Sequence, residues 1–72
     1  MADLTPAQRL GQRVHAARTE QGLTLQQVGT AAGISHTAVM RLEHGCEVEF
    51  SNAARIAGAL GISLDEPDGE TS

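Results

Sequence analysis

Apolar residues recur at three- and four-residue spacing in four segments of the chain, and residues that begin or end helices bound each segment. The predicted helices run from Pro6 to the residues before Gly22, over 25–32, over 36–44 and, approximately, over 52–60. A capping pattern at Ser63–Glu66 predicts a rudimentary fifth helix. The pattern therefore predicts an all-α fold without strands.

Two of these helices begin with a capping box, in which a threonine and a glutamine three residues later exchange hydrogen bonds with each other's backbone. Thr5 pairs with Gln8 in this way, and Thr24 pairs with Gln27. Ser35 holds the equivalent place before the third helix, where its hydroxyl can accept a hydrogen bond from the first turn.

The second and third helices are joined by a very short turn at Gly33, and helices joined so tightly cross steeply. Gly29, inside the second helix, costs roughly 1 kcal/mol relative to alanine. Close approach of the third helix would explain that glycine, and a tolerated loss of stability is the alternative. Nine apolar side chains are predicted to be buried: Leu10, Val14, Val28, Ile34, Val39, Leu42, Phe50, Ile56 and Leu60.

Three stretches, RLGQRVHAARTEQGLT, VGTAAGISHTAVMRLEHG and ARIAGALGISLDE, follow one another in an order typical of one family. Together they cover about residues 10–64 and resemble the helix-turn-helix domains of phage repressors and Cro proteins, also called the XRE type. The resemblance implies a small four-helix domain whose third helix enters the major groove of DNA.

The resemblance also implies a structural ion pair. In the family, an arginine at the position of Arg18 pairs with a glutamate at the end of the third helix, where Glu43 stands. Such a pair would hold the first helix to the third, and it would specify geometry more than it stabilises, because both charges lose solvation. A solvated surface arginine is the alternative.

Carried over from the family by position, the residues that contact base edges are His36, Thr37 and Arg41. An arginine can donate two hydrogen bonds to guanine, and a threonine can touch a thymine methyl or a phosphate. For Arg41 a phosphate contact is nearly as well supported as a base contact. For His36 the alternative is a solvated helix start.

Contacts to the DNA backbone are expected from four residues: Gln26, Ser35, Arg13 and Arg9. The family often has glutamine at the first position of the second helix, where this chain has Leu25. Gln26 is expected to substitute for it. The start of that helix also offers free N–H groups to a phosphate.

The charge of the chain complicates DNA binding. The formal net charge is −4, but residues 1–46 carry +1 and residues 47–72 carry −5. Relatives often place lysine or arginine after the third helix, and this chain has Glu47 and Glu49 there. These carboxylates would be repelled by a phosphate strand unless they turn away from it.

Several other classes of protein are excluded or disfavoured by the composition. Without a long apolar run, neither a membrane span nor a signal peptide is expected. The single Cys46 has no partner for an internal disulfide, so the cytoplasm is the expected location. One aromatic residue cannot form a stacking platform for single strands. The sequence has no nucleophile beside a base and no phosphate-binding glycine loop, so neither an enzyme nor a cofactor is expected. His44-x-Cys46 alone offers too few ligands for a metal site.

We therefore interpret residues 1–64 as a DNA-binding domain and residues 65–72 as an acidic, flexible tail. The predicted function is a sequence-specific regulator of transcription of the repressor type, which binds double-stranded DNA. The resemblance implies a homodimer, because such proteins bind two half-sites. The alternative is a protein-binding module, of an antitoxin-like or anti-regulator kind, which meets its partner through the acidic C-terminal half.

Overall fold

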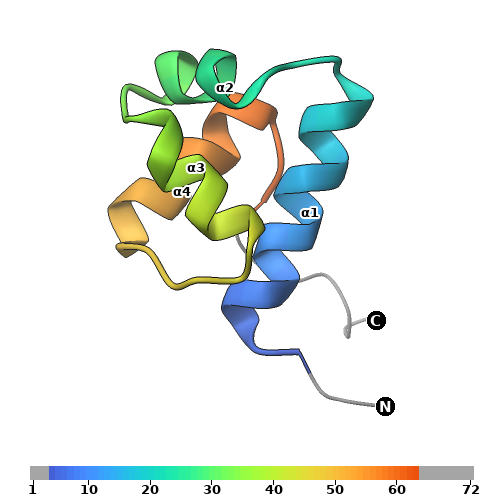
Figure 1. Ribbon diagram of the computed structural model, residues 1–72, viewed down its shortest axis with the longest axis vertical. Coiled ribbons are helices and arrows are strands. Elements are labelled where there is room, and N and C mark those ends of the chain that lie inside the picture. Colours follow the sequence, from blue (N-terminus) through green and yellow to red (C-terminus); the bar gives the residue numbers. More distant parts are fainter. Residues whose placement is uncertain (1–3, 64–72) are drawn as a thin grey trace.

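The computed structural model describes residues 4–63, which form helices and connecting turns with no strand in that range (Figure 1). The helices are α1 (Pro6–Glu20), α2 (Leu25–Ala32), α3 (His36–Glu43) and α4 (Phe50–Leu60). The all-α prediction is confirmed. Apart from Ser63, the fifth helix expected at 63–66 and the tail at 65–72 fall on residues outside the described range.

Both predicted capping boxes are present. Gln8 N donates to Thr5 Oγ1 at 3.1 Å, and Thr5 N donates to Gln8 Oε1 at 2.9 Å. The Thr24–Gln27 pair repeats the arrangement, at 3.0 and 2.8 Å. Ser35 is the residue before α3, but its side chain makes no capping hydrogen bond. Its hydroxyl thus remains available at the helix start.

Each helix ends in the same way, with a glycine of positive φ shortly after its last turn. The residue after that glycine donates its N–H back to a carbonyl five residues earlier, as in the Schellman motif. These bonds are Leu23 to Arg18, Ile34 to Gly29, Cys46 to Arg41 and Ile62 to Ala57, with N···O distances of 2.9–3.0 Å. Leu23, Ile34 and Ile62 then pack against the core. The fold-back predicted for Ile62 is confirmed.

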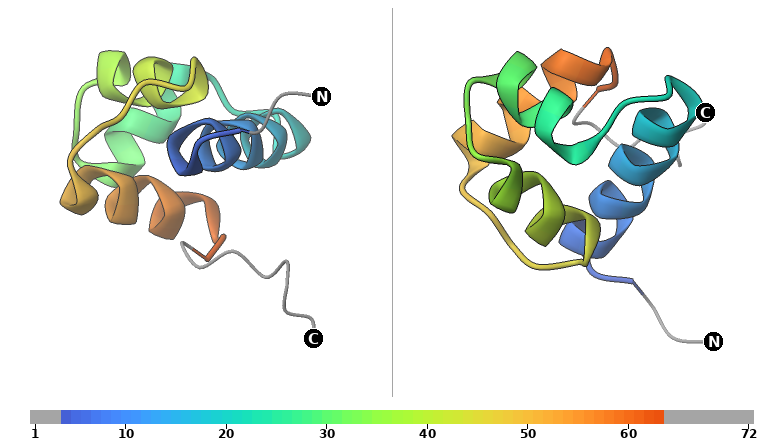
Figure 2. Two further views of the ribbon diagram at one scale, coloured as in Figure 1. Left: turned by 90° about the horizontal axis from the view of Figure 1, so that it is seen from below. Right: turned by 45° about the horizontal axis from the view of Figure 1, so that its top comes forward.

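The core lies between α3 on one side and α4 on the other, and α1 and α2 each contact both (Figures 1 and 2). Six predicted residues are buried: Val14, Val28, Val39, Leu42, Ile56 and Leu60. Leu10 and Ile34 are half-buried and pack against this cluster.

The prediction that Phe50 is buried is wrong, because its side chain is 77% exposed. Helix α4 begins two residues earlier than expected, with Glu49 as its N-cap and Phe50 as its first residue. Phe50 thus lies one turn before Ala53, the first buried residue of α4. Val48, not Phe50, supplies the apolar contact of this loop with the core.

Two glycines allow α3 to pack closely against its neighbours. A methyl group on Gly29 would lie 2.9 Å from the carbonyl oxygen of Ile34 and 3.0 Å from the nitrogen of His36. The predicted close approach at Gly29 is therefore confirmed. A methyl group on Gly11 would overlap the carbonyl oxygen of Leu42, so α1 meets the backbone of α3 directly.

We predict that Gly11→Ala destabilises the domain by about 1–3 kcal/mol, because α1 must move away from α3 to admit the methyl group. Gly58→Ala is the matched control, since no atom from outside its own stretch of helix backbone lies within 4 Å of a methyl group there. That substitution should stabilise α4 by about 0.4–1 kcal/mol. Urea unfolding of both variants tests this, and equal stability of the two would contradict the close packing of α1 on α3.

Candidate nucleic-acid interface

Helix α3 has one buried face and one open face. Val39 and Leu42 point into the core and are 0% and 1% exposed. On the opposite side, His36, Arg41 and His44 are exposed. Thr37, Ala38 and Met40 are half-buried between the two faces. The predicted orientation of α3 is therefore present: of the three expected base-contacting residues, His36 and Arg41 lie on its outer side and Thr37 lies at the boundary between the two faces.

Arg41 is available to bind a ligand. Among residues 4–63, its guanidinium takes part in no ion pair or side-chain hydrogen bond. It lines an open pocket between α3, the loop after it and the start of α4. The residues around this pocket are Ser35, Thr37, Ala38, Arg41, Glu47, Val48, Glu49 and Asn52. An arginine without a partner at an open surface suits an anion or a guanine edge.

The same pocket brings the acidic loop beside the expected base-contacting residues. Glu47 and Glu49 are both exposed, and they share the pocket with Thr37 and Arg41. The field at this end of α3 therefore combines one free cation with two carboxylates. An anion bound by Arg41 would therefore lie close to both carboxylates.

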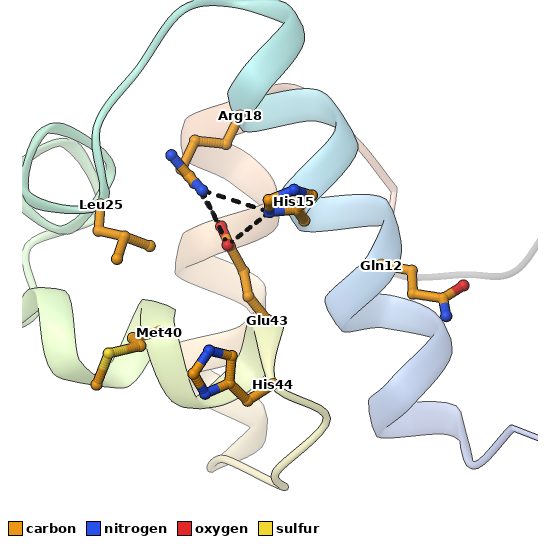
Figure 3. Close-up of a pocket in the computed structure, with 7 residues that line it drawn as sticks. All are labelled: Gln12, His15, Arg18, Leu25, Met40, Glu43 and His44. Carbon is orange, nitrogen blue, oxygen red and sulfur yellow. Dashed lines mark hydrogen bonds and ion pairs between the residues drawn. The ribbon is translucent and has the colours of Figure 1, made fainter.

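The predicted ion pair between α1 and α3 is present (Figure 3). Arg18 Nε donates to Glu43 Oε2 at 2.6 Å, and Arg18 Nη2 donates to Glu43 Oε1 at 3.1 Å. Arg18 Nη1 also donates to the carbonyl oxygen of Leu23 at 2.9 Å. One guanidinium thus joins α1, the turn before α2 and the end of α3.

His15 adds a contact that the sequence analysis did not anticipate. Its Nδ1 lies 2.9 Å from Glu43 Oε1 and 3.3 Å from Arg18 Nη2 (Figure 3). In the tautomer with hydrogen on Nδ1 the ring donates to Glu43, and in the other it accepts from Arg18. The spacing of His15 and Arg18, one helical turn apart, was the available signal for this contact.

The side chains of this cluster are shielded to different degrees. Glu43 is 7% exposed and Arg18 is 15% exposed. Burial by itself acts to raise the pKa of Glu43, but hydrogen bonds from Arg18 and His15 outweigh it, and the pKa is lowered. The hydrogen bond with Glu43 raises the pKa of Arg18. Both groups are therefore held in their charged forms.

Gln26 and Ser35 lie at the starts of the two crossing helices. Gln26 is the second residue of α2 and Ser35 directly precedes α3, and both side chains are exposed. Capping uses the N–H of Gln27, so the N–H groups of Leu25 and Gln26 stay open at the start of α2. These groups form a surface that can donate hydrogen bonds to an anion.

Arg13 and Arg9 lie elsewhere. Arg13 Nη2 donates to the carbonyl oxygen of Ser63 at 2.5 Å, beyond the end of α4. Its Nη1 is buried without a hydrogen-bond partner. Arg9 is exposed and lines a hollow on α1 with Arg13, Gln12 and Ala16. The structure therefore does not bring Arg13 and Arg9 together with Arg41, and a phosphate contact by Arg13 would break its bond to Ser63.

Metal binding and membrane insertion concern other features of residues 4–63. Within this range, no three His, Cys, Asp or Glu side chains are placed to hold a metal ion. None of the four described helices combines the length and the apolar character that crossing a membrane requires.

Comparison with known proteins gives one family. The family model described as helix-turn-helix, HTH_3, matches residues 14–66, and this range includes α2, α3 and α4 together with the C-terminal part of α1, residues 14–20. The match includes the Arg18–Glu43 pair and the outer residues of α3. A search of curated proteins finds no match.

We predict that removal of one charge from the Arg18–Glu43 pair destabilises the domain more than removal of both. Arg18→Ala or Glu43→Ala should each cost up to about 3 kcal/mol, because each leaves a shielded charge without its partner. The double variant should be more stable than the sum of the two losses predicts. Chemical unfolding in a double-mutant cycle measures the coupling, and a coupling of zero would contradict the role of the pair.

The lowered pKa of Glu43 gives a second prediction, on pH dependence. Its contribution to stability is complete above the ordinary glutamate pKa of 4.5 and is lost as the pH falls through the lower folded value. Unfolding measured from pH 6 to pH 3 should therefore show a steeper loss for the wild type than for Glu43→Gln. Parallel curves would mean that Glu43 does not gain stability from its partners.

Proposed function

The chain belongs to the helix-turn-helix family HTH_3, a family of DNA-binding domains, and from this premise we propose a sequence-specific regulator of transcription, of the repressor type. It binds double-stranded DNA as a homodimer, with α3 of each copy in the major groove. The observation that carries this proposal is the orientation of α3. Val39 and Leu42 anchor its inner face, and Arg41 is left exposed and without an ionic partner among the described residues.

The outer face of α3 offers groups of the types that distinguish base pairs. Arg41 can donate a pair of hydrogen bonds to O6 and N7 of guanine. The methyl group of Thr37 suits the methyl of thymine, and its hydroxyl suits a base edge or a phosphate. His36, at the first position of α3, lies at the end of the helix that reaches bases in such complexes. Arg41 is therefore the residue expected to contribute most to sequence preference.

Phosphate contacts come from the starts of α2 and α3. The open N–H groups of Leu25 and Gln26, the Gln26 amide and the unused Ser35 hydroxyl can each donate to a phosphate oxygen. Neutral donors fix the position of the protein on DNA but add little long-range attraction. Because Arg13 already donates to the carbonyl oxygen of Ser63, we do not include it in the primary contact surface.

The acidic loop limits how tightly one copy binds DNA. Glu47 and Glu49 lie in the pocket that also contains Arg41, close to where a phosphate strand would pass. Their repulsion lowers the affinity for every DNA sequence, because phosphates are present in all of them. A protein with such weak non-specific attraction gains by binding as a dimer to two half-sites about one helical turn apart. This supports the homodimer as part of the proposal.

We predict that Arg41→Ala weakens binding to the preferred site by about 1–3 kcal/mol, because the paired hydrogen bonds to a base are lost. Arg55→Ala is the matched control, since Arg55 is also exposed but lies on α4. Fluorescence titration of operator-length duplexes measures both affinities. An equal loss in the two variants would indicate that only net charge matters and that α3 does not contact the bases.

Replacement of Glu47 and Glu49 by lysine should have a different effect. Affinity should rise for all duplexes alike, since phosphate contacts carry no direct sequence information. The slope of log K against log salt should steepen by up to roughly 0.9 for each added contact. Glu20→Lys, at the exposed end of α1, controls for net charge. An unchanged affinity and an unchanged slope would mean that this loop does not approach DNA and that the proposed docking is wrong.

A further inference from the structure

Phe50 is the most exposed large apolar side chain among residues 4–63. Its exposed fraction is 77%, and Leu4, at 38%, is the other large apolar side chain exposed in this range. The remaining large apolar side chains described there are buried or half-buried. An exposed phenylalanine gives up the burial that normally makes this residue stabilise a fold. The fold itself therefore gives no reason for an aromatic side chain at this position.

Two acidic residues lie just before Phe50 in the sequence. Glu47 and Glu49 precede it in the loop between α3 and α4, and both are exposed. Neither takes part in an ion pair with another described residue. The backbone of this loop is fixed at both ends, by the hydrogen bond from Cys46 N to Arg41 O and by the start of α4. An apolar ring and two unpaired carboxylates are thus presented together on one short segment.

We propose that Phe50, Glu47 and Glu49 form a docking surface for a basic segment of another protein, and we call it the Phe50 surface. A segment that carries arginine or lysine beside an apolar side chain matches both the negative charge and the apolar ring of this surface. Its cations can pair with the two carboxylates or lie over the ring of Phe50, and its apolar side chain can cover the remainder of the ring. The complementary charge therefore specifies the chemistry of the partner.

A second copy of this chain fits the surface poorly. A twofold axis through Phe50 would bring Glu47 and Glu49 of both copies together, and like charges opposite one another are unfavourable. One aromatic side chain buries roughly 150–250 Å², far below the roughly 1,200–2,000 Å² of a stable interface. The surface therefore suits a short segment that binds transiently, and any pairing of two copies on DNA uses a different face.

The position of the surface connects it with DNA binding. Glu47 and Glu49 line the same open pocket as Thr37 and Arg41. A protein segment seated on the two carboxylates would cover Arg41 and add its own bulk at the groove-facing side of α3. The partner and DNA then exclude each other. This exclusion rests on the proposed function, whereas the docking surface does not.

The test uses a short synthetic peptide that alternates arginine with leucine, together with a matched peptide in which serine replaces leucine. Titration of the full chain, followed by backbone amide NMR shifts, should place the leucine peptide at residues 46–52. Phe50→Ser should weaken this binding by roughly 10-fold, as expected for loss of one buried aromatic contact. Replacement of Glu47 and Glu49 by glutamine should weaken it as well and reduce its salt dependence.

Matched controls separate this site from general attraction to an acidic protein. Leu4→Ser removes the other exposed apolar side chain, and Glu20→Gln removes an exposed carboxylate on α1; both should bind the peptide as the wild type does. Because Phe50 is exposed, Phe50→Ser should keep the thermal unfolding midpoint of the wild type. Equal affinity for the serine peptide, shifts spread over the whole chain, or loss of a dimer in Phe50→Ser with unchanged peptide affinity would overturn the proposal.

A competition experiment tests the exclusion separately. The leucine peptide should displace an operator duplex from the wild type and should displace it poorly from Phe50→Ser. Simultaneous binding of peptide and duplex would overturn the exclusion and leave the docking surface in place. A chain that binds the peptide at residues 46–52 but binds no duplex would overturn the proposed DNA-binding function alone.

Discussion

The bond between Arg18 and Glu43 fixes the position of α3, and the orientation of the proposed DNA-contacting face depends on that position. Its two hydrogen bonds and the third from Arg18 to Leu23 join helices α1 and α3 to the turn before α2. Gly11 permits the backbone of α1 to contact that of α3 directly, so the two helices joined by this bond cannot move closer together. A shielded ion pair adds little net stability, but it penalises every arrangement in which either charge loses its partner. The open face of α3 is therefore presented at a defined angle.

The sequence predicted the parts of the fold that depend on local rules. Capping boxes at Thr5 and Thr24 and the glycines that close helices follow from contacts within a few residues, and they located the helix ends. The Arg18–Glu43 pair depends on a contact across 25 residues, and it was available only through resemblance to a family. Helical spacing also located most of the core, because the buried face of each helix repeats every three or four residues.

The misplaced residues share a physical cause, since each depends on where chain segments meet in space. Phe50 was expected to be a buried residue of the loop before the fourth helix, but it is the first residue of α4 and its side chain is exposed. Arg13 contacts a carbonyl 50 residues away, and His15 contacts a carboxylate 28 residues away. No pattern in a single sequence indicates contacts between residues so far apart along the chain. The site residues on α3 were predicted by position in the family, and their contact with DNA remains a proposal.

If the outer face of α3 contacts base edges, selection of bound duplexes from a random library will show a sequence preference. The wild type should enrich an inverted repeat whose half-sites are about one helical turn apart. The same selection with Arg41→Ala should yield that repeat with one guanine position in each half-site no longer specified. Failure of the wild type to enrich any motif, or an identical motif from Arg41→Ala, would contradict this contact between α3 and base edges.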